Sequence, residues 1–159
     1  MTPRMLLLPA ILLQTVTASA QLSPVTFGGI PRWADSALRT AGLGSQFILV
    51  SELNPVYEFG DFDRDGLFDI AIEVKDTGGL RCGIAIAHRR DRSVYVMGAG
   101  RPLGTGRNQL PCRGSWGVQS PRAWDEHAGF GPDLIYVFER GATGWLVWDG
   151  QAYVWVEAA

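Results

Sequence analysis

Four aspartates fall within nine residues near the middle of the chain, with the spacing of a loop that binds a metal ion. They occupy positions one, three, five and nine of the loop: Asp61, Asp63, Asp65 and Asp69. Calcium takes about six to eight oxygen ligands at about 2.3–2.6 Å, and alternate side chains of a tightly curled loop point inward. Gly66 permits the sharp turn, and the backbone carbonyl of Leu67 can add a ligand. The loop therefore predicts a calcium site, which Asp69 closes directly or through water.

The residues on either side of this loop read as strands. An EF-hand would require flanking helices and a glutamate at position twelve, where this chain has Ile72. The run from Phe59-Gly60 through the four aspartates to Ile70 instead resembles the calcium loop of FG-GAP or VCBS-type repeats, which occur in integrin-like propellers and bacterial exported proteins. The resemblance covers about residues 59–74, and it implies the same ligands: the four aspartate side chains and the Leu67 carbonyl. It does not extend to a whole propeller, because a propeller needs about four to eight blades.

The N-terminus has the pattern of an export signal. Arg4 precedes an apolar run over residues 5–13, and Ala18-Ser19-Ala20 fits the small-residue rule for cleavage. The sequence thus predicts a signal peptide over residues 1–20 and one domain over 21–159, in the periplasm or outside the cell. The apolar run is shorter than the ~20 residues that span a bilayer, so we expect no stable membrane insertion after cleavage. An uncleaved anchor is the alternative.

Charge and cysteine content narrow the possibilities further. Loss of Arg4 with the signal reduces the 14 basic side chains to 13, against 16 acidic ones, for a net charge of −3. Such a balance provides no argument for a nucleic-acid partner. Cys82 and Cys112 are the only cysteines, and in an exported protein they predict one disulfide.

Apolar periodicity predicts one helix followed by strands. Pro31 and the spacing of Trp33, Ala34, Ala37 and Leu38 favour a helix over residues 31–41. Short alternating or apolar runs predict strands at 47–50, 56–59, 70–74, 84–87, 94–97, 134–138, 145–148 and 153–156. Their connections are too short for helical crossovers, so the sheets should be antiparallel. The expected fold is mainly β, a small antiparallel sheet or sandwich with one N-terminal helix.

The strand region has an internal similarity. Three strands of a first meander, 60–97, match three strands of a second, 125–157, at offsets of 64, 61 and 58 residues. The calcium loop has a degenerate counterpart in the second copy, where the positions of the four aspartates align with Asp125, His127, Gly129 and Asp133. We therefore expect two three-stranded meanders, of which only the first has a complete loop. Chance similarity among short hairpins is the alternative.

Residues 98–132, between the meanders, are rich in glycine, proline and arginine and predict an irregular segment. Long loops without regular structure are often functional. The segment provides a candidate partner surface made of Arg101, Arg107, Arg113, Trp116, Arg122 and Trp124. The partner would be a protein or a carbohydrate. The six tryptophans of the chain can equally be core residues.

Three classes of function fit these features. The first is an exported, non-catalytic module with one structural calcium ion, which acts in binding or adhesion or as an inhibitor in the cell envelope. The second is a purely structural envelope protein. The third is a secreted hydrolase that uses His127 or His88 as a general base. Calcium ligands that surround the ion leave no open position for substrate, so the loop itself predicts no catalysis.

Overall fold

The fold comes from a computed structural model of the 159-residue chain. The structure describes residues 29–50, 57–103, 107–110, 112, 115–119, 134–139 and 142–157, with the backbone alone at 134, 136, 138–139 and 142–143. The predicted signal peptide and the counterpart of the loop at 125–133 lie outside these residues. Within the described part, no helix has the length and apolar character needed to cross a bilayer.

The first sheet contains five strands: β1 (Phe47–Leu49), β2 (Tyr57–Gly60), β3 (Asp69–Asp76), β4 (Cys82–Ala87) and β5 (Val94–Gly98). Strands β3, β4 and β5 form the expected antiparallel meander. The long strand β3 has two partners on its other edge. Its N-terminal half pairs with β2, so that Gly60 lies opposite Asp69, and its C-terminal half pairs with β1. The loop that contains the aspartates joins β2 to β3.

The second sheet contains four strands in sequence order: β6 (Ser115–Gln119), β7 (Leu134–Glu139), β8 (Ala142–Trp148) and β9 (Tyr153–Glu157). All neighbours are antiparallel, and β7, β8 and β9 form the second expected meander. Strand β6 lies in the stretch for which the sequence predicts no regular structure, and that prediction is wrong there. Trp116 and Val118 of β6 pack with the core, and this burial stabilises the strand. The neighbouring glycines and prolines favour turns, so the local sequence does not predict it.

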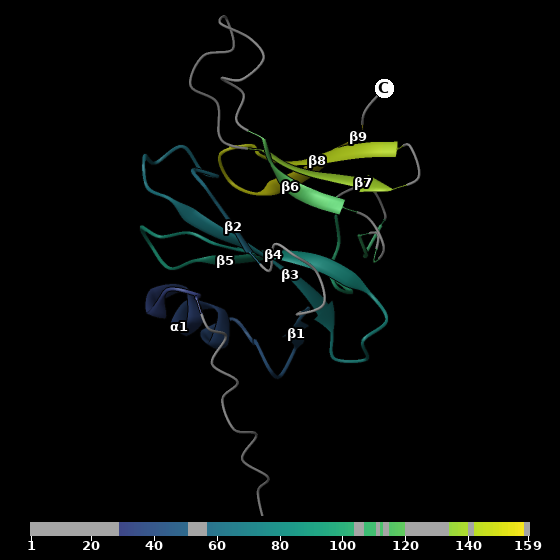
Figure 1. Ribbon diagram of the computed structural model, residues 1–159, viewed down its shortest axis with the longest axis horizontal. Helices are drawn as coiled ribbons and strands as arrows, with labels where there is room; N and C mark the ends of the chain where they lie inside the picture. Colours follow the sequence, from purple (N-terminus) through teal and green to yellow (C-terminus); the bar gives the residue numbers. More distant parts are fainter. Residues whose placement is uncertain are drawn as a thin grey trace, which may run out of the picture.

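The helix and the two sheets form three layers, with the first sheet in the middle (Figure 1). Alternate residues of β3 and β4 face opposite sides of the first sheet. Ala71, Ile84 and Ile86 face the second sheet, in a core that also includes Ile135, Leu146 and Trp155. On the other side, a second core beneath the helix contains Leu38, Phe47, Ile72, Val74, Ala85 and Val96. The expectation of a mainly β, antiparallel fold with one helix is confirmed, and the described residues form neither a closed barrel nor a propeller.

The helix α1 (Arg32–Thr40) falls where the sequence predicts it. Pro31 immediately precedes it and favours a helix start at this point, because the proline ring presets the backbone for a first turn and its nitrogen needs no hydrogen-bond partner. Its buried face is formed by Ala34, Ala37 and Leu38. Gly42 adopts a φ of +111°, a conformation that favours glycine, and the chain then turns back toward β1.

One disulfide joins Cys82 to Cys112, with 5.2 Å between their Cα atoms, which confirms the pairing expected from the sequence. Cys82 is the first residue of β4, and Cys112 lies a few residues before β6. The bridge therefore ties the first sheet to the stretch that leads into the second.

Candidate metal centre

The loop between β2 and β3 brings three of its aspartates together. Asp61, Asp63 and Asp65 each offer one carboxylate oxygen, and these oxygens lie within 4.8 Å of one another. Two ligands on opposite sides of a calcium ion would be about 4.6–5.2 Å apart, so the spacing fits a shared cation. Oxygen-only ligands of this kind suit a hard divalent ion.

Hydrogen bonds to the loop backbone hold the three carboxylates in place. The amide of Asp65 donates to Asp63 Oδ1 (3.0 Å), the amide of Gly66 donates to Asp61 Oδ2 (3.1 Å), and the amide of Leu67 donates to Asp65 Oδ1 (2.7 Å). The chain must curl tightly to make them. Arg64 and Gly66 both have positive φ, +68° and +84°, and such a φ is uncommon for a residue other than glycine. That the Leu67 carbonyl is a ligand stays a prediction.

Phe62 anchors the loop from inside. Its side chain is fully buried in the core between the sheets, although it lies between two partly exposed aspartates. The ring covers Gly60, where an added Cβ would lie 2.7 Å from the Phe62 Cζ atom. A glycine at this position thus makes room for the aromatic ring that fixes the start of the loop.

Asp69 occupies the other end of the loop and is fully buried. Its Oδ2 accepts a hydrogen bond from the Phe62 amide (3.1 Å), and its Oδ1 accepts one from the Arg89 amide (2.8 Å). Burial raises the pKa of Asp69 to about 7, with Asp63 and Asp65 adding to the rise and the two amides opposing it. The carboxylate retains lone pairs for a cation, and a cation would favour its charged form.

Asp69 belongs to a second group of possible ligands with Asp63 and His88, whose ligand atoms also lie within 4.8 Å of one another. Asp63 is common to both groups and is therefore central to the site. Burial raises the pKa of Asp63, and the neighbouring His88 opposes that rise.

His88, which follows β4, is the residue of the site that the sequence placed least well. Its side chain is 2% exposed. Nδ1 lies 3.2 Å from Asp63 Oδ2, and Nε2 lies 2.7 Å from the hydroxyl of Tyr153 on β9. Burial lowers the pKa of His88, although Asp63 and two further aspartates favour its charged form.

Three aromatic rings surround His88 at the point where the ends of the two sheets meet. Its ring centroid lies 4.9 Å from that of Tyr95, 5.1 Å from Trp148 and 5.7 Å from Tyr153. The three rings also contact one another, with centroids 4.9–5.5 Å apart. The cluster accordingly contains residues of β5, β8 and β9, so the acidic loop lies against a junction of both sheets.

Arg90 partly neutralises the loop from outside. Its Nε donates to Asp65 Oδ2 (2.6 Å), and its Nη2 donates to the Asp65 backbone carbonyl (2.7 Å). Burial works against the charged form of Asp65, but the hydrogen bonds from Arg90 and Leu67 hold its pKa below the ordinary value. A cation at the loop would share the Asp65 carboxylate with this guanidinium.

The proposed partner surface is only partly described. Arg101 donates to Gln46 Oε1 (2.6 Å), and Arg107 lies 3.1 Å from Glu157 with more than half of its side chain exposed. Trp116 is buried at 8% exposure, so its assignment to a partner surface was wrong: alternation along β6 points it into the core. Arg113, Arg122, Trp124 and His127 lie outside the described residues.

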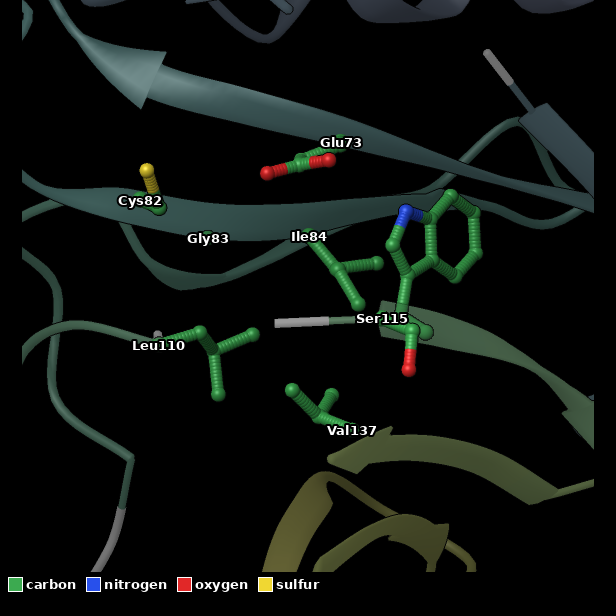
Figure 2. Close-up of a pocket in the computed structure, with 8 residues that line it drawn as sticks. Glu73, Cys82, Gly83, Ile84, Leu110, Ser115 and Val137 are labelled. Carbon is green, nitrogen blue, oxygen red and sulfur yellow. The ribbon is translucent and has the colours of Figure 1, made fainter. Parts of the chain in front are cut away.

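A second buried acid, Glu73 of β3, faces the other sheet. It lines a small cavity with Cys82, Gly83, Ile84, Leu110, Ser115, Trp116 and Val137 (Figure 2). Burial raises the pKa of Glu73, and the charge of Lys75 opposes the rise. Glu73 Oε2 and Trp116 Nε1 make no hydrogen bond among the described residues.

The chain matches no protein-family model, no curated protein and no solved structure.

Proposed function

We propose that this chain is an exported, non-catalytic binding module in which one calcium ion stabilises the loop between β2 and β3. The observation that carries the proposal is the convergence of Asp61, Asp63 and Asp65, whose oxygens lie at the spacing of ligands around one calcium ion. The resemblance of residues 59–74 to FG-GAP or VCBS-type loops supports the same ion.

The physical role of the ion follows from charge. Four carboxylates within nine residues repel one another, and burial of Asp69 makes its ionisation costly. A divalent cation would neutralise the loop and fix the pairing of β2 with β3, which begins at Gly60 and Asp69. Calcium at about 100 times its dissociation constant would add about 2.7 kcal/mol to the free energy of unfolding.

Thermal unfolding in calcium and in EGTA tests this role. We expect calcium to raise the melting temperature of the wild-type protein, and Asp63→Ala or Asp65→Ala to abolish the increase. Glu157→Gln is the matched control, because it removes one acidic charge from an exposed side chain at the end of β9, far along the chain from the loop. A wild-type melting curve that EGTA leaves unmoved would contradict the proposal.

The partner of the module is proposed to be a protein or carbohydrate of the cell envelope. Of the arginines in the irregular segment, Arg101 and Arg107 are described, and both lie on connections rather than in the core. Deletion of the segment would remove Cys112 and β6, so charge reversal is the cleaner experiment. We expect Arg101→Glu/Arg107→Glu to lose proteins or glycans captured from envelope extracts, whereas Arg32→Glu, at an exposed position of α1, should retain them. Equal capture by both variants would favour the purely structural role.

The geometry of His88 does not favour the hydrolase alternative. Both of its ring nitrogens have partners, and its side chain is 2% exposed, so a substrate could reach it only if the aromatic cluster opened. His127 lies outside the described residues, and its role as a general base stays a prediction.

A further inference from the structure

His88 connects the acidic loop of the first sheet to the hairpin of the second. Its Nδ1 contacts Asp63 Oδ2 at 3.2 Å, and its Nε2 contacts the Tyr153 hydroxyl at 2.7 Å. Asp63 belongs to the loop, whereas Tyr153 is the first residue of β9. Asp63, His88 and Tyr153 therefore form a line of polar contacts from one sheet to the other, of which the His88–Tyr153 contact is a hydrogen bond and the His88–Asp63 contact is a close charge-favoured approach.

The chemistry of the two ends favours one tautomer of His88. A charged carboxylate only accepts, so the tautomer with its hydrogen on Nδ1 suits the contact with Asp63. In the neutral ring Nε2 then accepts, and the Tyr153 hydroxyl donates to it. A tyrosine hydroxyl is protonated at neutral pH, as this donor role requires.

The surroundings leave His88 little freedom to turn. The side chain is almost fully buried, and the rings of Tyr95, Trp148 and Tyr153 lie within 4.9–5.7 Å of its ring. Residues that contact a metal ligand without contacting the metal orient that ligand, and their removal lowers metal affinity about 10- to 100-fold. The oxygen atoms of Asp63 are thus positioned by a histidine whose own orientation depends on the opposite sheet.

We propose that His88 is a positioning residue for Asp63, and that the Tyr153 hydroxyl thereby sets the calcium affinity of a loop on the other sheet. This inference rests on the proposed calcium site. Because linkage is reciprocal, calcium in the loop should in turn stabilise the β8–β9 hairpin, which contributes no ligand.

Three variants test the Asp63–His88 contact and the His88–Tyr153 contact separately. Tyr153→Phe removes only the distant hydroxyl. His88→Asn keeps an amide donor where Nδ1 lies but loses the bond to Tyr153, and His88→Gln places its amide nearer to Nε2 and loses the donor to Asp63. Tyr95→Phe is the matched control, because its ring contacts the same histidine at 4.9 Å.

Calcium affinity is measured by titration in competition with a fluorescent chelator, and folding is checked by circular dichroism in EGTA. We expect about a tenfold weaker affinity for His88→Gln, a several-fold loss for Tyr153→Phe and for His88→Asn, and wild-type affinity for Tyr95→Phe. Tyr153→Phe should add no further loss in the His88→Asn background, because its effect passes through the ring.

Hydrogen exchange provides a readout that a purely structural role would not change. Calcium should slow amide exchange in peptides from β8–β9 of the wild-type protein, and Tyr153→Phe should abolish that slowing while leaving the exchange of β8–β9 in EGTA unchanged. Wild-type affinity in folded Tyr153→Phe would overturn the inference and leave the calcium site intact. If Tyr153→Phe fails to fold, wild-type affinity in His88→Asn overturns it equally. Absence of calcium binding by the wild-type protein would instead overturn the proposed function.

Discussion

The two four-stranded parts of the molecule, β2–β5 and β6–β9, have the same connectivity but differ in the loop between their first two strands. In each part the first strand pairs with the second, and a meander follows. In the first part this loop spans residues 61–68 and contains the converging carboxylates, whereas in the second part the connecting residues 120–133 have His127 and Gly129 where Asp63 and Asp65 would align. The comparison teaches that the same strand order forms with and without acids of this spacing between its first two strands.

The parts also differ in what each contributes where they meet. The first provides His88 and Tyr95 from the β4–β5 hairpin, and the second provides Trp148 and Tyr153 from the β8–β9 hairpin. Tyr95 and Tyr153 are counterparts in the sequence similarity, yet only Tyr153 has a hydroxyl placed to bond His88. The second part therefore supports the site of the first without resembling it there.

The largest expected effect concerns the covalent link between the two parts. Cys82→Ser/Cys112→Ser should lower the free energy of unfolding by about 3–4 kcal/mol, because the bridge closes a loop of about 30 residues in the unfolded chain. Guanidinium unfolding of the variant against the oxidised wild-type protein measures this. If the reduced wild-type protein does not match the double variant, the loss comes from the serines rather than from the missing bridge.

A pair of matched glycines is expected to distinguish the packing of the two sheets. Gly83 on β4 and Gly144 on β8 are counterparts, but an added Cβ would meet backbone at Gly83, 2.6 Å from the Ala99 nitrogen, and the Trp155 ring at Gly144. Backbone cannot turn aside, so Gly83→Ala should cost about 3 kcal/mol and Gly144→Ala about 1–2 kcal/mol, within the range for overpacking.

Chemical denaturation of both alanine variants tests this difference. Gly144→Ala should lower the free energy of unfolding less in a Trp155→Leu background than in the wild-type protein, since that background lacks the ring that collides with the added methyl group. The prediction would fail if Gly144→Ala proved the more destabilising of the two.

The acidic loop should make the calcium effect depend on pH. Asp69, with a pKa near 7 against an ordinary value near 4, destabilises the ion-free protein as the pH rises through this window. Calcium favours the charged form, so the melting temperature in calcium minus that in EGTA should increase from pH 5.5 to pH 8. The corresponding contribution of calcium to the free energy of unfolding should increase by about 1 kcal/mol per pH unit below pH 7. A difference that stays constant with pH would show that Asp69 is already charged without the ion.

The smallest expected effect concerns Arg90, which pairs with Asp65 of the acidic loop. Arg90→Gln removes a positive charge that shares Asp65 with the ion, so calcium affinity should rise a few-fold while the ion-free protein becomes slightly less stable. The side chain is 62% exposed, and salt should therefore weaken both changes. Chelator competition at low and high salt provides the measurement, and unchanged affinity would place the ion away from Asp65.

Local patterns predicted most of the fold. The helix and eight strands were expected from apolar periodicity, because one face of each packs against a core. Strand β6 was missed because its Trp116-Gly117-Val118 core is short and lies among residues that favour turns. Alternation alone did not predict the burial of Glu73, because it does not show that the second sheet covers one face of β3 and the helix covers the other.

The candidate site was predicted only as far as its own loop. The spacing of the aspartates carries that signal within nine residues. Phe62 and His88 carry no comparable signal: their importance depends on a core and a hairpin that are distant in the sequence. An apolar residue between two aspartates was the available indication for Phe62. For His88, the position at the end of β4 gave no hint of Tyr153, 65 residues away.

The burial of Phe62 has a consequence for how quickly the site would respond. Because this ring fixes the loop from the core side and the carboxylates of Asp61, Asp63 and Asp65 remain partly exposed, an ion could enter and leave without the strands separating. Occupancy would then follow the surrounding concentration promptly, and the residence time of the ion would be set by its ligands rather than by any opening of the sandwich.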